Sequence, residues 1–242
     1  MQTILHNAGH FAEAQKALEN FIVTYGGDKR IDQVNFQLGL ALMEQKLWQP
    51  ALVNFSKVLK QSVWRDEAVY QSAWCEKRAG RKLVAIGYYK ELLVAHKNSP
   101  LINPTILELA ELEFEGENYD DAISRLTKFM ESNPEQSLKI RAQYRLGWCF
   151  YGKKQYDKAA ELYESALPAV PQELSIVTAW QAGESRLRNK EYALASAHYQ
   201  TAIKAVKPKD KNLIQLQGQA RLRLGHSQAQ EKKWEDSGKT YS

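Results

Sequence analysis

Apolar residues recur at the spacing of an α-helix in two successive stretches within residues 140–171. The first stretch holds Leu146 and Phe150, and the second holds Tyr156 and Tyr163. A short polar break that contains a glycine separates them, which is typical of a tight turn. The pattern therefore predicts a helix, a turn and a second helix.

Each predicted helix of this segment carries one small residue, Gly147 on the first helix and Ala159 on the second. The break between the helices begins at Gly152, and the segment ends at Pro171, which cannot continue a helix. Two antiparallel helices joined by so short a turn approach each other closely. A large side chain where they cross would hold them apart, so we call the small residue of each first helix the crossing residue.

Both small residues recur along the chain at a nearly constant spacing. Neighbouring members of the second-helix series are 37, 34, 37, 37, 36 and 42 residues apart. Two series that keep the same step predict one helix pair repeated along the whole chain. The crossing residues are Gly39, Ala73, Ala110, Gly147, Gly183 and Gly225, and the second-helix residues are Ala14, Ala51, Ala85, Ala122, Ala159, Ala195 and Ser237.

This pattern resembles the tetratricopeptide repeat, a family with a period of about 34 residues whose first helix carries a Leu-Gly pair. Its second helix carries alanines and an aromatic residue and is followed by proline. The resemblance implies an all-α fold, a right-handed superhelical solenoid of antiparallel helix pairs. Because both ends cut a repeat, we expect the chain to be part of a longer protein. The predicted solenoid spans 1–242, with a second helix alone at 1–25, full repeats at 32–62, 66–97, 103–134, 140–171 and 176–208, and a truncated repeat at 218–242.

Four repeats depart from the family pattern three residues after the crossing residue. The family usually has a large apolar residue there, whereas this chain has Glu76, Glu113, Arg186 and Gln228. The apolar residue at this position is therefore not a reliable mark of the repeat in this chain.

First helices line the concave face of such a solenoid. The residues three before, one after and four after each crossing residue share a helical side that points away from the partner helix. Three of the six Trp residues lie at these positions, with arginines close by. Since Trp, Tyr and Arg concentrate binding energy at interfaces, we predict a peptide-binding groove. Its residues are Tyr70, Trp74, Lys77, Arg78, Arg141, Tyr144, Arg145, Trp148, Tyr151, Trp180, Glu184 and Arg188.

We expect the rings of this groove to be left without intramolecular contacts. The alternative is that they pack against the neighbouring first helix and only complete the core. The same helical side also includes Phe36, Leu107 and Phe114. A partner that suits the groove is a protein or peptide with an extended segment and apolar anchors, and with acidic residues or a C-terminal carboxylate.

Seven carboxylates and no Lys or Arg lie between Glu108 and Asp121. A calcium site is excluded by spacing, because no loop centred on glycine alternates oxygen ligands. We interpret the segment as a solvated acidic rim, and the alternative is a contact for a basic stretch of the partner.

Signs of an enzyme are weak, so we predict a non-enzymatic protein without a cofactor or a metal. His6 and His10 could share a helix face but lack a third ligand. The stretch Gly238–Thr240 resembles the end of a phosphate-binding loop without its earlier glycine. Cys75 and Cys149 lie two repeats apart, too far for a disulfide, and are interpreted as small buried hydrophobic residues.

The charge of the chain is mild, with 33 basic and 28 acidic residues and a net charge of +5. The basic residues are scattered, which disfavours a nucleic-acid partner. The sequence contains no run of about 18 apolar residues, so we predict no membrane span in it. Two alternatives stay open. One is an RNA-binding helical repeat module whose rings stack on bases, and the other is the repeat part of a larger enzyme or of a secretion or envelope assembly protein.

Two sequence segments resemble a more specific group within this family. Residues 17–21 followed by Tyr25, and then residues 35–39, are similar to bacterial envelope tetratricopeptide proteins of the Tol-Pal coordinator and outer-membrane assembly lipoprotein type. This resemblance implies a periplasmic adaptor.

Overall fold

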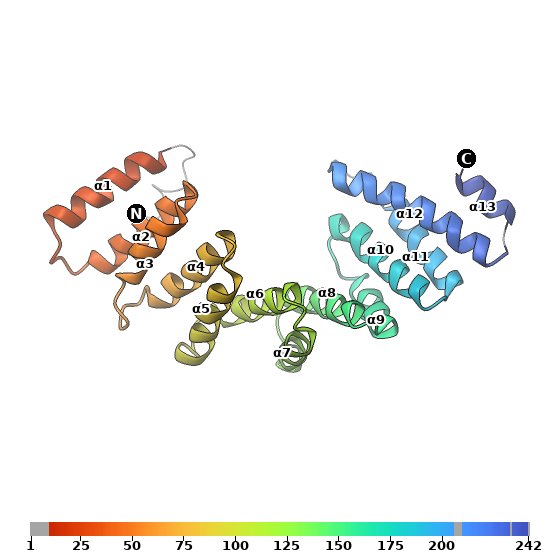
Figure 1. Ribbon diagram of the computed structural model, residues 1–242, viewed down its shortest axis with the longest axis horizontal. Helices are drawn as coiled ribbons and strands as arrows, with labels where there is room; N and C mark the ends of the chain where they lie inside the picture. The colour runs from red at the N-terminus through yellow and green to blue at the C-terminus, as the bar shows by residue number, and fades with distance from the viewer. Residues whose placement is uncertain (1–9, 206–209, 233, 242) are drawn as a thin grey trace. The chain divides into compact units, whose positions relative to one another are not determined.

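The protein is described by a computed structural model covering residues 10–205, 210–232 and 234–241 (Figure 1). Within these ranges the secondary structure consists of α-helices without strands, which confirms the prediction of an all-α fold. The helices are α1 (Phe11–Thr24), α2 (Ile31–Glu44), α3 (Trp48–Ser56), α4 (Arg65–Arg78), α5 (Lys82–Ala95), α6 (Ile102–Glu115), α7 (Tyr119–Glu131), α8 (Gln136–Gly152), α9 (Tyr156–Ala166), α10 (Gln172–Arg188), α11 (Tyr192–Lys204), α12 (Lys211–Gln230) and α13 (Trp234–Tyr241).

Contacts group the chain into two compact units, an N-terminal unit (Met1–Leu112) and a C-terminal unit (Glu113–Ser242). The division falls within α6. Each unit is built from consecutive helices that pack on their neighbours in sequence. The single continuous solenoid over 1–242, with its repeat boundaries, stays a prediction.

The turns inside the helix pairs share one backbone device. The chain leaves α8 through Lys154, which has a φ of 60°. The amide of Gln155 donates to the carbonyl of Phe150 at 2.9 Å, and the amide of Lys154 donates to that of Tyr151 at 2.9 Å, which together form a Schellman motif. The left-handed residue is thus Lys154 rather than the glycine of the predicted polar break, because Gly152 still belongs to α8. Equivalent residues with positive φ are Lys46, Gly80, Glu117, Lys190 and Lys232.

In the N-terminal unit, α2 packs against α1, α3 and α4, and α4 packs against α5. The crossing of α2 and α3 is tight, because a Cβ atom built on Gly39 would lie 2.4 Å from the ring of Phe55. Phe36, which the sequence placed on the groove side, is buried in the core and stacks on Trp64 with ring centroids 5.4 Å apart. Leu107 is likewise buried. For these two positions the prediction of groove-lining side chains was wrong.

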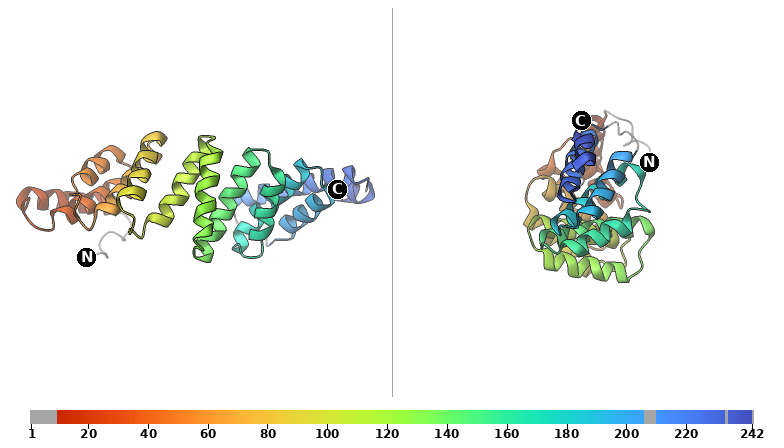
Figure 2. Two further views of the ribbon diagram at one scale, coloured as in Figure 1. Left: turned by 90° about the horizontal axis from the view of Figure 1, so that it is seen from below. Right: turned by 90° about the vertical axis from the view of Figure 1, so that its right-hand side faces the viewer.

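In the C-terminal unit, α10 packs against α9, α11 and α12. Figure 2 gives two further views of the chain, in which the helices of this unit are coloured from green to blue. Cβ atoms built on Gly147 and Gly183 would each lie 2.7 Å from a ring, those of Tyr163 and Tyr199 respectively. Both rings are fully buried. The role predicted for the crossing residues is therefore confirmed at both pairs, since only a small residue admits the aromatic ring of the second helix.

The four polar residues that depart from the family pattern are all paired, and all but the half-buried Arg186 are buried. In α4, Glu76 accepts a hydrogen bond from Arg81, which follows the turn. In α6, Glu113 is 3% exposed and accepts from Arg125 Nη2 at 2.7 Å and Nε at 3.0 Å. Each buried carboxylate thus has a guanidinium partner, without which its burial would be strongly unfavourable.

Further along the C-terminal unit the same position holds a cation in α10 and a neutral amide in α12. Arg186 in α10 donates to both oxygens of Glu164, at 2.8 Å and 2.7 Å, and to Glu191 at 2.9 Å. In α12, Gln228 accepts from the hydroxyl of Thr240 at 2.8 Å. The departures from the family pattern therefore place polar contacts at this position, between the two helices of a pair for Glu113 and Gln228. Glu76 pairs with the turn that follows it, and Arg186 pairs mainly with α9 of the preceding repeat.

Both cysteines are free and buried, Cys75 in α4 and Cys149 in α8. This confirms the interpretation of both as buried residues outside a disulfide. Burial raises the pKa of each thiol to about 12. Among the helices of the described ranges, none combines the length and the apolar character needed to cross a membrane.

Candidate functional site

Four predicted groove residues lie on α4 in the N-terminal unit. Tyr70 is half-buried. Trp74 is also half-buried, and the guanidinium of Arg78 lies 4.6 Å from the centroid of its ring. The ammonium of Lys77 is already paired within the unit, because it donates to Glu108 at 2.9 Å and to Glu111 at 3.2 Å. Of the four, Trp74 and Arg78 therefore present the most usable binding surface.

These contacts correct the prediction of a solvated acidic rim for three of its seven carboxylates, whereas Glu115, Glu117, Asp120 and Asp121 are exposed as predicted. Glu108 and Glu111 share the ammonium of Lys77, and Glu113 is buried against Arg125. No Lys or Arg lies among these carboxylates in the sequence, but the neighbouring helices supply cations.

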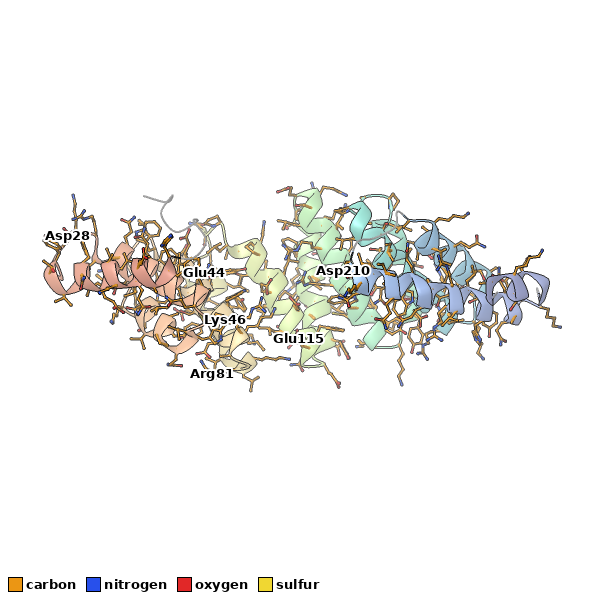
Figure 3. The ribbon with its side chains drawn as sticks, turned by 90° about the horizontal axis from the view of Figure 1, so that it is seen from above. Asp28, Glu44, Lys46, Arg81, Glu115 and Asp210 are labelled. Carbon is orange, nitrogen blue, oxygen red and sulfur yellow. The ribbon has the colours of Figure 1, made fainter. Side chains whose placement is uncertain are left out.

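A hollow of about 320 Å³, here called the N-terminal hollow, surrounds the exposed part of Trp74. The ring of Trp48 meets that of Trp74 edge to face, with centroids 5.6 Å apart. Figure 3 labels Glu44 and Lys46, which come from the end of α2 and the turn after it. The lining residues are Met43, Glu44, Lys46, Trp48, Trp74 and Arg78.

A second hollow of about 360 Å³, the C-terminal hollow, brings together three predicted groove residues, Trp148, Tyr151 and Trp180. Phe114, Gly152 and Gln181 complete its lining. All four aromatic side chains are half-buried, so their rings are fixed in part and exposed in part.

The rings of the C-terminal unit are not free of intramolecular contacts, contrary to the prediction. The centroid of Trp148 lies 5.6 Å from that of Phe114 and 4.9 Å from that of Tyr144. Tyr151 meets Tyr156 at 5.2 Å. Tyr144 is half-buried, and burial raises the pKa of its hydroxyl to about 12. The rings therefore serve both purposes, since each packs on a neighbour and most keep an exposed part.

Gly152 is required beneath the C-terminal hollow. A Cβ atom built on it would lie 2.6 Å from the ring of Tyr119, so only glycine lets that ring take its place. Tyr119 also contacts Phe114, with ring centroids 5.6 Å apart. A side chain at position 152 would thus disturb the wall of the hollow.

The predicted basic edge of the groove is present in part. Arg141 and Arg188 are exposed, and Arg145 is half-buried. Nε of Arg188 donates to the hydroxyl of Tyr151 at 3.4 Å, which places its guanidinium next to a lining residue of the C-terminal hollow.

Glu184 is not available to a partner, although the sequence placed it in the groove. Its side chain is buried, with the residue 4% exposed. Its Oε1 accepts from the hydroxyl of Tyr199 at 2.7 Å and pairs with Nε of Arg223 at 2.9 Å. The carboxylate is therefore a structural partner of α11 and α12. Position 184 follows a crossing residue directly, and the rule that assigned it to the groove does not account for its burial.

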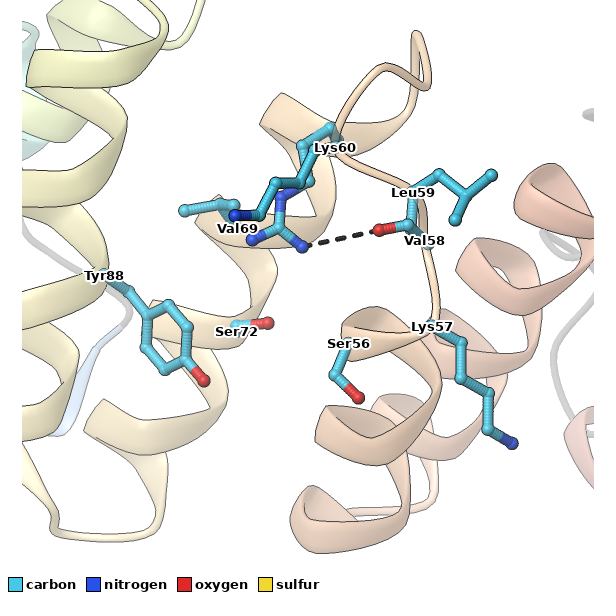
Figure 4. A pocket seen from close by; sticks show the side chains of 9 residues that line it. Ser56, Lys57, Val58, Leu59, Lys60, Val69, Ser72 and Tyr88 are labelled. Atoms are coloured by element: carbon cyan, nitrogen blue, oxygen red, sulfur yellow. Dashed lines mark hydrogen bonds between the residues drawn. The ribbon is translucent and has the colours of Figure 1, made fainter.

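A further hollow of about 290 Å³, which no sequence pattern indicated, lies where α3, α4 and α5 meet (Figure 4). The dashed line in Figure 4 is the bond that Arg65 Nη1 donates to the carbonyl of Val58 at 3.4 Å. Nη2 of Arg65 donates to Glu91 at 3.0 Å. Because this guanidinium already has a carboxylate, the hollow is a weaker candidate than the two aromatic ones.

The enzyme and metal features found in the sequence gain no support where they are described. Across residues 10–205, 210–232 and 234–241, no group of three or more His, Cys, Asp or Glu side chains could hold a metal ion. His6 lies outside the described residues, and His10 bonds to Glu13 at 2.9 Å. Gly238–Thr240 belongs to helix α13, so it does not form a phosphate-binding loop.

Comparisons with known proteins show which fold the chain shares with them. The sequence model of the tetratricopeptide repeat family matches residues 107–173. No curated protein sequence matches the chain. Three solved structures are similar to it. The C-terminal part of a repeat-containing protein from Cytophaga hutchinsonii has a TM-score of 0.72 at 12% identity, covering 96% of this chain and 95% of that chain.

A tetratricopeptide repeat protein from Parabacteroides merdae has a TM-score of 0.67 at 16% identity, covering 95% of this chain and 90% of that chain. MamA from Desulfovibrio magneticus has a TM-score of 0.62 at 17% identity, covering 72% of this chain and 93% of that chain. Such likeness establishes the fold. The chain thus has the fold of tetratricopeptide repeat proteins, and residues 107–173 carry the sequence pattern of that family.

Proposed function

We propose that the protein is a non-enzymatic scaffold that binds an extended segment of a protein partner, with an apolar anchor of that segment in the C-terminal hollow. One observation carries the proposal. Four half-buried aromatic side chains, those of Phe114, Trp148, Tyr151 and Trp180, line a single hollow of about 360 Å³. Its size is at the lower end of the range of ligand pockets, about 300–1,000 Å³.

The ring contacts support this role because they fix the site before a partner arrives. Trp148 is held between Phe114 and Tyr144, so its ring loses little freedom on binding. Buried Trp and Tyr anchors contribute about 2 kcal/mol or more each at interfaces. An apolar side chain of the partner would gain this energy without a rearrangement of the fold.

The arginines of the same unit favour a partner with acidic residues or a terminal carboxylate. Arg188 is exposed and lies next to Tyr151, and Arg141 is exposed on α8. A guanidinium binds a carboxylate through two parallel hydrogen bonds. Carboxylates that flank the apolar anchor would therefore be recognised at the edge of the hollow.

The test is a pull-down from a lysate of the source organism with the full chain and with Trp148→Ala and Tyr151→Ala. We expect each substitution to reduce recovery of the partner about tenfold or more, as loss of an interface anchor does. Leu83→Ala is the matched control, because Leu83 is an apolar residue 84% exposed on α5. Unchanged recovery with both aromatic variants, when circular dichroism shows them folded, would remove the proposal.

RNA is the second candidate, favoured by aromatic rings that lie beside arginines, since bases stack on such rings. An RNA ligand predicts an affinity that falls steeply with salt, whereas an apolar anchor does not. A binding assay at two salt concentrations separates the two candidates.

We also propose a periplasmic location, which the resemblance of residues 17–25 and 35–39 to envelope proteins supports. Cell fractionation of the source organism, followed by detection with an antibody, tests it.

A further inference from the structure

Two cations of the N-terminal hollow have no carboxylate partner among the described residues. Arg78 stacks on Trp74 at 4.6 Å, and Lys46 is exposed in the turn after α2. Arg81 and Arg125, by contrast, are paired with carboxylates, those of Glu76 and Glu113. Arg78 therefore keeps N–H donors that its own fold does not use.

The stacking of Arg78 prepares these donors for a ligand. A guanidinium on the face of an indole keeps its N–H groups at its edge, where they remain able to donate. The indole also restricts the side chain, so less entropy is lost when a bond forms. A carboxylate is the group that matches this planar fork, because it accepts two parallel hydrogen bonds.

The rest of the hollow combines apolar walls with a positive charge. Trp48 and Trp74 stand edge to face at 5.6 Å, and Met43 lines the same space. Glu44 is the one carboxylate among the lining residues, against the two cations. A ligand with an acidic group and an apolar body therefore complements both the charge and the walls.

We propose that the N-terminal hollow is a separate binding site, for a carboxylate attached to an aromatic or apolar group, such as an acidic residue beside an aromatic residue in a partner segment. Arg78 binds the carboxylate while it stays stacked on Trp74, Lys46 adds the second charge, and Trp48 covers the apolar group. The site extends the proposed scaffold function but does not depend on the C-terminal hollow, which lies in the other unit.

The test uses two small probes that differ in one charge. N-acetylphenylalanine has a ring and a carboxylate, and its amide has the ring alone. Each is titrated into the ¹⁵N-labelled full chain, and the indole N–H signals of Trp48 and Trp74 are assigned from Trp→Phe variants. We expect the acid to bind with a dissociation constant of about 1 mM, as suits so small a ligand, and the amide to bind at least about fivefold more weakly.

Two substitutions in the hollow are compared with a third that removes the same charge elsewhere. Arg78→Gln and Lys46→Asn should each weaken binding of the acid about fivefold or more, which is about 1 kcal/mol, and leave binding of the amide unchanged. Asparagine suits position 46 because it tolerates the positive φ of 60° found there. Lys57→Gln is the control, since Lys57 is exposed in the same unit and does not line this hollow.

The outcomes separate this proposal from the proposed function. Equal binding of acid and amide, or shifts at Trp148 and Trp180 instead of Trp48 and Trp74, would overturn the site. So would an Arg78→Gln variant that is folded and binds the acid as the wild type does. Trp148→Ala should leave binding of the acid unchanged, even though it removes the C-terminal anchor site. Loss of one site with retention of the other shows which of the two proposals has failed.

Discussion

The N-terminal and C-terminal hollows occupy the same place in two different repeats. One wall is the residue four positions after a crossing residue, Met43 in one unit and Phe114 in the other. The opposite wall is the residue directly after the next crossing residue, Trp74 or Trp148. The repeated backbone therefore determines where a hollow forms in each unit.

The two hollows differ five positions after the second crossing residue. Arg78 stands there in the N-terminal unit and lies over Trp74, whereas the C-terminal unit has Gly152. With the guanidinium absent, the ring of Tyr119 takes the space beside the glycine. This position therefore contributes to the difference in charge between the two hollows, and the repeats share a backbone geometry but differ in the side chains that line it.

The largest effect is expected when the arginine of the N-terminal hollow is placed at the equivalent position of the C-terminal hollow. Gly152→Arg should lower the free energy of unfolding by about 1–3 kcal/mol, because its Cβ would overlap the ring of Tyr119. Urea denaturation followed by circular dichroism measures this. Gly87→Arg is the control, since Gly87 is exposed in α5 with open space around it. Equal stability of the two variants would show that the ring of Tyr119 does not need a glycine.

A smaller effect is expected from exchanging the turn residues of the two units. Gly80→Lys should lower the free energy of unfolding by about 1 kcal/mol, because a side chain is strained at its φ of +79°. Lys154→Gly should raise it by about 0.5 kcal/mol, since strain is relieved while the unfolded chain gains freedom. Thermal unfolding of both variants measures these changes. Ala79→Gly, one residue earlier at a φ of −78°, should destabilise, and stabilisation there would contradict the argument.

The smallest effect concerns pH and the polar position of the C-terminal unit. The guanidinium of Arg186, with His198, holds the pKa of Glu164 below its ordinary value near 4.5. A lowered pKa stabilises the folded state above the unfolded value, and this contribution is lost as the pH falls through the folded value. Between pH 5 and pH 3 the wild type should therefore lose more stability than Glu164→Gln, by less than about 1 kcal/mol because the pair is partly exposed.

Urea titrations at both pH values measure this difference. Glu161→Gln is the control, because Glu161 is exposed on the same helix. A wild type and a Glu164→Gln variant with the same pH dependence would remove the assigned role of this pair.

The small residues were sufficient to predict how the helices pair. Gly147 and Gly183 could be assigned to helix crossings because a fixed step linked them to the alanines of the second helices. The structure confirms both, with Tyr163 and Tyr199 seated on the glycines. Volume at a crossing is a local property that a sequence records directly, and this explains the success.

The side chains of the hollows could be predicted only in part. Trp148, Tyr151 and Trp180 were identified from their positions on first helices. Lys46 was missed because it lies in a turn, and Trp48 was missed because it lies on a second helix. Glu184 was assigned wrongly, since its burial depends on Tyr199 and Arg223, which are 15 and 39 residues away. The position of a residue on a helix predicts the direction of its side chain. Whether that side chain is buried in an ion pair or a hydrogen bond depends on residues of other helices, which the helical pattern does not predict.

The placement of the two thiols has a practical consequence. Each unit contains one, Cys75 or Cys149, and at neutral pH almost none of either is in the thiolate form that reacts with alkylating agents. A thiol becomes modified when its own unit opens, so the rate of alkylation at each cysteine reports the local opening of that unit. The native chain therefore contains one reporter of local opening in each unit. Mass spectrometry of its peptides can follow the alkylation of each cysteine without an introduced label.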